Sequence, residues 1–546
     1  MTFEEFIPAK TKSLLELTGK TDENFESTEE KFLAVQPDCK YKVAENLSGV
    51  EGKFEVILTE SPVIGKLEGN ELDDFIKKIA EKLEPQGLLI FALENLAFAE
   101  NILDILKGLP PKYKLTLTRA ELGDALKKSG ITVMKSMTAS RQIEVDEKIA
   151  ELSKDNPKIF MYIVTAMKDI PEKKVYIHTV IGESIVCAPL RVHAPNAFFR
   201  KEPNVFVKWQ PMTEPYKITS DETFTEKIFI GQRLSLNTFD EGRKLFDLVD
   251  RAGYLAVAEM DDHPNLWQKS YEDNGWINFV GVHAVQTSTE YLAEYLRQYN
   301  PVVKVFANHL PKLPKPRNYD EEFKNKKRPV TILFAALNRD REFLDLLPVL
   351  NQFAKDYGNK IAFKILARSN LYEKLESKNK SFVGDLNYYD GQFVSYERYE
   401  NAIRESDIAI LPLNDSEFNR SKSDLKFIEC AGNGAVVLAS DVVYPGVVEE
   451  GKTGFIYGDK KEFVQKLKML ISSPDKRRKV AEEAYKYVRY NRLMSQHYTE
   501  RLEWYSELFA RLPELHKATR ERIEKLAPKF SKENFGKHGE ILIPGN

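Results

Sequence analysis

The chain has 546 residues, of which 42% are hydrophobic and 11% aromatic. This is enough for packed cores in roughly two to four domains and excludes a disordered protein. The formal net charge is −3 with 30% charged residues. No basic excess of the kind that nucleic-acid-binding proteins use is present, so we expect no nucleic-acid partner.

Cysteine usage and the N-terminus suggest the compartment. The three cysteines, Cys39, Cys187 and Cys430, are too scattered for a disulfide framework or a zinc site, which favours a reducing cytoplasm. The first residues lack a secretion signal, and no apolar run reaches the roughly 18–20 residues of a membrane span. We expect a cytoplasmic protein and leave peripheral membrane association open.

Residues 1–170 form a first block of alternating strand and helix patterns. Strands are predicted at Phe54–Leu58 and Pro85–Phe91, a helix at Glu71–Leu83, and a further helix followed by a strand from Leu117 onward. These segments resemble the second half of class I methyltransferase folds.

The first block departs from that family in its glycines. Methyltransferases bind their cofactor through a glycine-rich turn after the first strand, where the backbone must approach the ligand closely. Here Gly19 is the only glycine before Gly49, and no G-x-G is present. We expect a truncated, non-catalytic module that binds a partner protein, with active methylation as the alternative.

Residues 171–320 read as a Rossmann-like domain, because apolar runs alternate with helical stretches and predict a parallel sheet. The predicted strands are Val175–Val180, Asn204–Val207, Lys227–Ile230, Tyr254–Ala258 and Val302–Phe306, and the predicted helices are Asp240–Ala252 and Ser288–Tyr299.

Polar residues follow the strands of this domain. Asp261, Asp262 and His263 come directly after a buried strand, at the edge where α/β proteins bind ligands. Three interpretations stay open: a partial metal site, a place at the reaction centre for Asp262 or His263, and a helix N-cap before proline. Arg191 and Arg233 also end or follow strands, so they either face a cleft and orient an anionic ligand or make ordinary ion pairs.

A proline-rich, charged linker at 311–329 leads into the next block, residues 321–475. There a buried strand at Asp407–Leu413 precedes a polar helix in which Lys422, Lys426 and Glu429 are spaced i, i+4, i+7 and are expected on one helix face. Cations near a helix N-terminus attract phosphate, and a carboxylate accepts hydrogen bonds from sugar hydroxyls. The alternative is a solvated helix with surface ion pairs.

Residues 476–546 complete the chain. The stretch from Pro474 to Leu526 is charged and has a helix-period apolar stripe, so we expect helices there, followed by a tail.

The segment after Phe418 resembles the donor-sugar region of retaining GT-B glycosyltransferases of the group 1 family. The matching positions are Lys426, Glu429, Ala431, Gly434, Val437, Ala439 and Ser440. The resemblance implies an α/β GT-B fold, with two Rossmann-like domains facing across a cleft and the last helices crossing back to the first. It implies a nucleoside-diphosphate sugar as donor, retention of configuration and no required metal or other cofactor.

The resemblance also assigns residues. Expected donor-binding residues are Arg339, Arg341, Lys422, Ser423, Asp424, Lys426 and Glu429, and expected catalytic residues are Asp262, His263 and Lys426.

One departure from the family concerns a carboxylate. Many relatives carry a second glutamate eight positions before the one matched by Glu429, where this chain has Ser421. Glu417 or Asp424 could replace it. The acceptor stays open between a glycan, a lipid-linked glycan and a surface protein, and the rival interpretation is a catalytically inactive scaffold that binds a nucleotide sugar or a partner.

Overall fold

The computed structural model describes residues 3–18, 28–59, 61–64, 67, 71–94, 119–140, 159–169, 173–182, 187–214, 218–319, 328–335, 339–366, 369–384 and 394–531. The chain divides into two compact units. The first contains Met1–Ile177, Asn196–Lys208 and Asp221–Lys227, and the second contains His178–Pro195, Trp209–Ser220 and Ile228–Asn546. Three six-stranded sheets are found in the described residues, and we call them the N-terminal, middle and C-terminal sheets.

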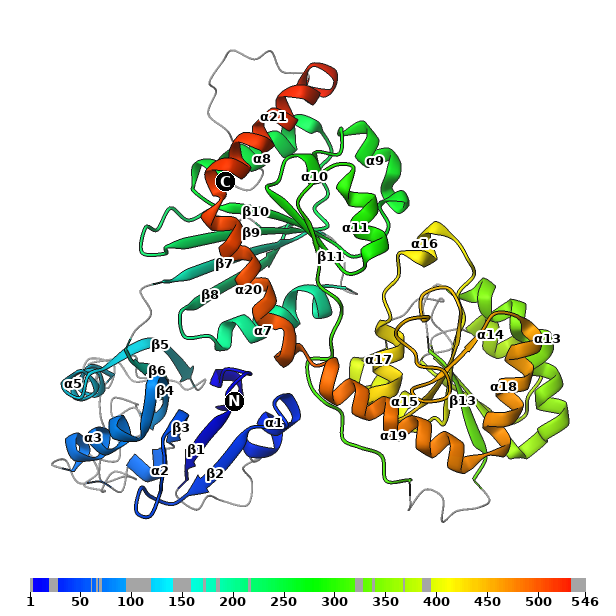
Figure 1. The fold of residues 1–546 in the computed structure, drawn as a ribbon, viewed down its shortest axis with the longest axis horizontal. Coiled ribbons are helices and arrows are strands. Elements are labelled where there is room, and N and C mark those ends of the chain that lie inside the picture. The colour runs from blue at the N-terminus through cyan, green and yellow to red at the C-terminus, as the bar shows by residue number, and fades with distance from the viewer. Residues whose placement is uncertain are drawn as a thin grey trace, which may run out of the picture. The chain divides into compact units, whose positions relative to one another are not determined.

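The N-terminal sheet has the strand order β2-β1-β3-β4-β6-β5, parallel from β2 to β4, with β6 antiparallel to both β4 and β5. Helices α3 and α5 cover one face, and α1 with η1 covers the other (Figure 1). The elements are η1 (Phe3–Phe6), β1 (Ser13–Leu17), α1 (Thr28–Val35), β2 (Lys40–Ala44), β3 (Phe54–Thr59), α2 (Ser61–Ile64), α3 (Leu72–Lys82), β4 (Leu83–Glu94), α5 (Arg119–Lys128), β5 (Ile131–Ser140) and β6 (Ile159–Lys168).

The middle sheet has the order β12-β11-β10-β9-β7-β8, and its β9–β12 pairs are parallel. Thr238 and Thr289 start its two longer helices, α8 and α11, by accepting a hydrogen bond from a first-turn N–H. The elements are β7 (Val175–Ile181), η2 (Pro189–His193, a π-helix), α7 (Ala194–Lys201), β8 (Val205–Pro211), β9 (Glu226–Gln232), α8 (Phe239–Arg251), β10 (Leu255–Met260), η3 (Pro264–Trp267), α9 (Gln268–Asp273), α10 (Ile277–Val280), β11 (Ala284–Thr287), α11 (Glu290–Arg297) and β12 (Val303–Val305).

The C-terminal sheet is parallel throughout, with the order β15-β14-β13-β16-β17-β18. Alternate residues of β16 pack into separate cores on its two faces, Ile408 and Ile410 into one and Ala409 and Leu411 into the other. Burial on both faces explains the uninterrupted apolar sequence of this strand.

The elements around the C-terminal sheet are β13 (Val330–Phe334), α13 (Asp340–Tyr357), η4 (Gly358–Lys360), β14 (Ile361–Leu366), α14 (Ser369–Lys374), β15 (Lys380–Val383), α15 (Tyr396–Arg404), β16 (Ile408–Leu411), α16 (Glu417–Arg420), α17 (Leu425–Gly432), β17 (Val436–Ser440), β18 (Phe455–Tyr457), α18 (Lys460–Ser472) and α19 (Pro474–Asn491).

Two final helices, α20 (Met494–Ala510) and α21 (Leu512–Phe530), return to the middle sheet, where α20 contacts β10 and α21 contacts α8 and α10 (Figure 1). The Tyr505 hydroxyl of α20 donates to Gln286 Oε1 of β11 at 2.6 Å. The predicted fold class is confirmed: the molecule is α/β, with Rossmann-like parallel sheets and an additional α/β module before them. The likeness of that module to methyltransferases and the four domain boundaries stay predictions.

The predicted polar helix is wrong at its start. Helix α17 begins at Leu425, and Lys422 lies in a non-helical loop between α16 and α17. Lys422 and Lys426 therefore do not share a helix face. The physical reason is tertiary: side chains from elsewhere in the chain bind Ser423 and Asp424 and hold residues 421–424 out of the helix.

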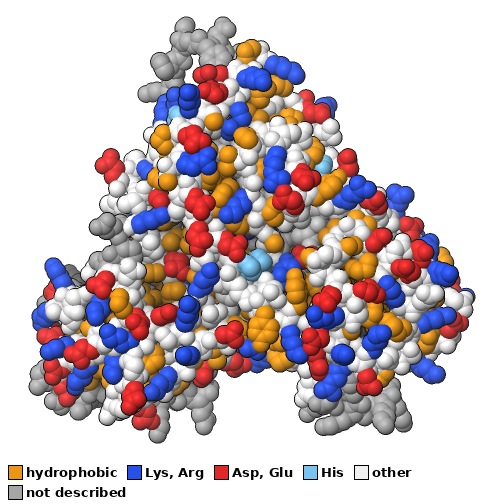
Figure 2. Space-filling model, in the orientation of Figure 1, with side chains coloured by type: hydrophobic (Ala, Val, Ile, Leu, Met, Phe, Trp, Pro, Cys, Tyr) orange, Lys and Arg blue, Asp and Glu red, His pale blue; other side chains and the backbone are white. Residues whose placement is uncertain are grey.

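Figure 2 shows acidic and basic side chains interspersed over the face in view. Among the described residues, none of the helices combines the length and the apolar character needed to span a bilayer.

Candidate functional site

A ligand-sized cavity lies where the middle and C-terminal sheets end. Its volume is about 720 Å³, and it is bordered by the start of α11, the end of β12, the α16–α17 loop and the loop after β17. Loops that follow the carboxyl ends of parallel strands are where α/β folds bind ligands. The lining residues are Ser288, Thr289, Glu290, Tyr291, Val305, Ala307, Asp415, Arg420, Lys422, Ser423, Asp424, Asp441, Val442, Val443, Val447 and Arg492.

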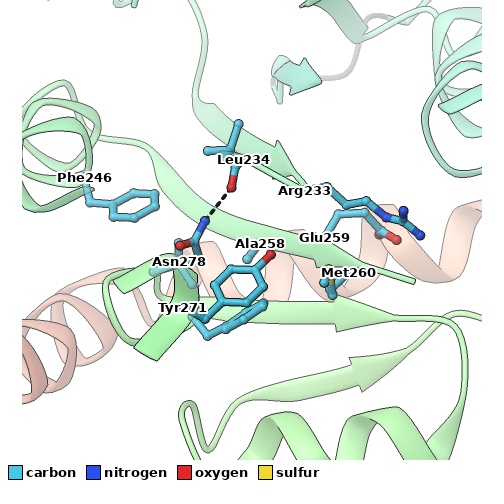
Figure 3. Close-up of a pocket in the computed structure, with 11 residues that line it drawn as sticks. Arg233, Leu234, Phe246, Ala258, Glu259, Met260, Tyr271 and Asn278 are labelled. Carbon is cyan, nitrogen blue, oxygen red and sulfur yellow. Dashed lines mark hydrogen bonds between the residues drawn. The ribbon is translucent and has the colours of Figure 1, made fainter. Parts of the chain in front are cut away.

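A second cavity, lined by Arg233, Glu259, Tyr271 and Asn278 among others, is far smaller (Figure 3). Asn278 closes one side by donating to the Leu234 carbonyl at 2.7 Å. Its volume is about 10 Å³, room for about one water molecule. It is a packing void of the middle sheet, so the larger cavity is the candidate ligand site.

Lys422 makes an ion pair with Asp262, and its ammonium also lies 4.0 Å from the centre of the Phe418 ring. Burial lowers the pKa of Lys422, while the neighbouring Asp262 opposes that shift and Arg339 adds to it. Two predicted site residues that are far apart in the sequence, Asp262 and Lys422, are thus brought into direct contact.

Arg233 makes ion pairs with both carboxylates of the acidic pair Asp261 and Asp262. Its Nε donates to Asp261 Oδ1 at 2.7 Å and its Nη2 to Asp262 Oδ2 at 2.9 Å. Its backbone has φ of 45°, a left-handed conformation that costs a non-glycine residue of order 1–3 kcal/mol and persists only where surrounding contacts enforce it. A Cβ on Gly182 would lie 2.2 Å from the Arg233 carbonyl oxygen, so only glycine fits there.

His263 is buried beside the acidic pair. Its Nδ1 accepts the Asn265 N–H at 3.2 Å, which makes His263 the N-cap of η3, and its ring lies 4.4 Å from that of Tyr295 between centroids. Burial lowers its pKa, so the imidazole is neutral near pH 7 with its proton on Nε2.

Lys426 and Glu429 lie on α17 and form one cluster with Tyr399 of α15. The Lys426 ammonium donates to Glu429 Oε2 and to the Tyr399 hydroxyl, both at 2.9 Å, and the hydroxyl donates to Glu429 Oε2 at 2.6 Å. Glu429 is 6% exposed and depends on these two partners, because an unpaired buried carboxylate is costly.

Ser423 and Asp424 are held by the two segments through which the chain crosses between the middle and C-terminal sheets. Asn308 donates to Ser423 Oγ at 2.8 Å, and Arg492 makes a bidentate ion pair with Asp424. The crossing segments pair with each other, because the Leu310 N–H donates to the Arg492 carbonyl at 2.8 Å. The α16–α17 loop is therefore anchored to both crossing segments.

The remaining predicted residues occupy different settings. Arg191 is 2% exposed and donates to Glu259, Asn308 and the carbonyls of Thr287 and Phe306. This is an internal hydrogen-bond network. Burial acts to lower the pKa of Arg191, and the Glu259 charge outweighs it.

Arg339 and Arg341 both lie at the start of α13. Arg339 is its half-buried N-cap, and Arg341 is exposed in the first turn. The charge of Arg339 contributes to lowering the pKa of Lys422.

Asp250, His283 and His516 could hold a metal by residue type, with ligand atoms within 4.8 Å of one another. The hydrogen bonds argue against it. His283 Nδ1 accepts the Ala256 N–H at 2.8 Å, so the neutral ring carries its proton on Nε2, which faces Asp250. A metal would need that same nitrogen unprotonated. We interpret the cluster as a contact between α8 and α21.

Sequence reasoning missed Tyr399, Asn308, Arg492 and Thr289, whose hydroxyl donates to the Ser421 carbonyl at 3.0 Å. Tyr399 shares a buried helix stripe with Ala402 and Ile403 and so resembles core. Each acts on residues more than twenty positions away, and no local pattern marks such a contact.

Comparisons with known proteins add the following. A family model described as glycosyl transferase-like matches residues 350–503. No curated protein matches the sequence.

Several solved structures are similar to this chain, and three of them align over their full length. The Anabaena protein HepE in complex with UDP and glucose has 12% identity and a TM-score of 0.44 over 61% of this chain and 100% of its own. Sucrose-phosphate synthase from Thermosynechococcus elongatus has 10% identity and a TM-score of 0.42 over 62% and 100%. TarM has 12% identity and a TM-score of 0.40 over 92% and 100%.

The C-terminal sheet and its helices thus carry most of the segment similar to glycosyl transferases, residues 350–503, and the last two helices return to the middle sheet.

Proposed function

We propose that this protein transfers a sugar from a nucleoside-diphosphate sugar to a glycan, lipid-linked glycan or surface-protein acceptor. The observation that carries the proposal is the cavity bordered by the α16–α17 loop, with Lys422 in its wall and Lys426 and Glu429 on the helix that follows. These residues fall inside the glycosyl transferase-like segment.

The chemistry that the site must supply is stabilisation of negative charge. When the glycosidic bond to the diphosphate breaks, charge develops on the leaving oxygens. Lys422, Lys426, Arg339 and Arg341 are the cations suited to stabilise it. Glu429 would accept hydrogen bonds from the nucleotide ribose, and Asp262 and His263 would lie beside the transferred sugar.

Retention of configuration and independence of metal belong to the same proposal. Lysine and arginine side chains would supply the positive charge around the diphosphate, so a divalent cation is not needed for charge balance. We expect turnover to persist in excess EDTA, and its complete loss with recovery on adding Mg²⁺ would overturn this part.

The test uses UDP-, GDP-, dTDP- and CMP-sugars in binding and slow-hydrolysis assays. We expect one class to bind and Lys426→Ala to lower its hydrolysis at least ten-fold, while Lys468→Ala, an exposed lysine of α18, leaves it unchanged. Full activity of Lys426→Ala would contradict the assignment of that residue.

A catalytically inactive scaffold is the second candidate. It is favoured by Ser421, which is fully buried and donates its hydroxyl to the Phe418 carbonyl at 2.7 Å instead of offering a carboxylate. Binding of a donor without any hydrolysis or transfer would support this candidate. We further propose that the N-terminal module is non-catalytic and binds a partner protein.

A further inference from the structure

Tyr399 is the buried centre of the cluster that contains Lys426 and Glu429. Its helix, α15, is capped by Ser395, whose Oγ accepts the Arg398 N–H at 3.3 Å, and its Tyr399, Ala402 and Ile403 side chains are buried. Helix α15 packs against α17, so the Tyr399 hydroxyl meets α17 at Lys426 and Glu429. The hydroxyl is therefore placed by helix packing and not by a flexible loop.

The hydroxyl uses both of its hydrogen-bonding roles. It donates to Glu429 Oε2 at 2.6 Å and accepts from the Lys426 ammonium at 2.9 Å. The same ammonium lies 4.4 Å from the centre of the Tyr399 ring. Hydrogen bonds to charged groups are stronger than neutral ones, and a phenol that donates to one ion and accepts from the other fixes both.

The contacts leave defined atoms for a ligand. Glu429 Oε1 takes part in none of these three contacts, and an ammonium has three donors, of which Tyr399 and Glu429 use two. The Lys426 side chain is 34% exposed against 8% for Glu429. One oxygen and one N–H are thus held at a fixed separation, suited to a hydroxyl and an adjacent phosphate.

We propose that Tyr399 is a positioning residue for donor binding: its hydroxyl holds Glu429 and Lys426 in the arrangement that binds the nucleotide ribose and diphosphate. The inference rests on the proposed function. Tyr399 itself does not touch the donor, so its removal should weaken donor binding without abolishing the chemistry.

The phenol stays protonated in this role. Burial and the charge of Glu429 raise the pKa of Tyr399 well above its ordinary value. The hydroxyl is therefore a donor to Glu429 throughout the pH range in which the protein would work.

The experiment compares Tyr399→Phe with Tyr357→Phe in the full-length chain. Tyr357 ends α13, an 18-residue helix about 27 Å long that starts next to Arg339, so it reports on loss of a hydroxyl far from the site. UDP-glucose, GDP-mannose and dTDP-glucose are each titrated by calorimetry, and slow hydrolysis gives kcat and KM.

We expect Tyr399→Phe to raise the Kd and KM for the bound donor about ten-fold, because its two hydrogen bonds to charged groups are lost, with kcat changed less than three-fold. Tyr357→Phe should match the wild type. Combined with Glu429→Gln, the effect should be less than additive, because both changes weaken the same contact.

The outcomes separate the two proposals. If the wild type binds a donor and Tyr399→Phe binds it equally well, Tyr399 has no positioning role and the proposed function stands. A lower melting temperature with unchanged Kd assigns Tyr399 to the core alone and also overturns the inference. If the wild type binds none of these donors and no other nucleotide sugar of the panel above, the proposed function fails and this inference fails with it.

Discussion

Asp262 pairs with two cations of the candidate site. It binds Lys422 through Oδ1 and Arg233 through Oδ2. Under the proposed function, a diphosphate that binds to Lys422 would have to compete with this carboxylate.

Asp262→Asn should therefore tighten binding of the free nucleoside diphosphate. Removing one negative charge next to two cations should lower its Kd roughly three- to ten-fold at low ionic strength, and the gain should shrink as salt screens it. Calorimetry at about 20 mM and about 500 mM NaCl checks this difference in Kd. Asp273→Asn, at the exposed end of α9, is the control, and weaker binding by Asp262→Asn would refute the competition.

At the residue scale, the charged side chains of the site can be predicted from the sequence, but most of the residues they pair with cannot. Lys426 and Glu429 are three apart on one helix, so their pairing is visible in the sequence. Tyr399 is 30 positions from Glu429, and only packing of α15 on α17 brings its hydroxyl into contact.

At the element scale, the contact between α8 and α21 depends on Asp250. Its carboxylate is paired with His516 and lies 3.5 Å from His283 Nε2. Burial raises the pKa of Asp250, but the hydrogen bond from His283 and the charge of His516 outweigh it and hold the pKa below its ordinary value.

A carboxylate with a lowered folded pKa stabilises the protein above its unfolded pKa, near 3.9, and this stabilisation is lost as pH falls through the folded pKa. Asp250→Asn should lower the free energy of unfolding at pH 7 by roughly 1–3 kcal/mol. Thermal unfolding should show a decrease of roughly 2–10 °C at pH 7 that becomes smaller as the pH falls below about 3.9. A decrease that does not change with pH would show that packing and not charge is responsible.

The boundaries of strands and helices also depend in part on the local sequence and in part on tertiary contacts. The apolar run predicted as a strand at Asp407–Leu413 contains β16, which is buried on both faces. The sequence between α16 and α17 contains no proline or glycine that would mark a break, and Ser421–Asp424 are instead held out of the helix by Thr289, Asn308 and Arg492.

At the scale of the whole molecule, Arg492 joins the two crossing segments to the α16–α17 loop. It lies in the returning segment, forms two contacts to Asp424, and donates to the Asn308 carbonyl of the outgoing segment at 2.8 Å. The position of the loop that carries Lys422 therefore depends on this arginine.

Arg492→Lys keeps the charge but loses the fork that binds both carboxylate oxygens. We expect turnover to fall about ten-fold and the free energy of unfolding by roughly 1–3 kcal/mol, measured by donor hydrolysis and denaturant unfolding. Arg511→Lys, which alters an exposed bidentate pair with Glu514, should be near neutral. Equal turnover and equal stability of the two variants would contradict a role for the contact between Arg492 and Asp424.

The sequence by itself determined the α/β class, the parallel sheets and most strands and helices, because buried apolar periodicity is a local property of the chain. The return of the C-terminal helices was implied only by the family resemblance. It also placed the cations and carboxylates near the carboxyl ends of strands. Only the tertiary structure decided which of them meet. Lys422 lies outside the helix and pairs with Asp262, Arg191 belongs to an internal network, and Tyr399 contacts Lys426 and Glu429. Charged side chains are long and pair with whatever packing brings within reach, so their partners are set by the fold and not by spacing.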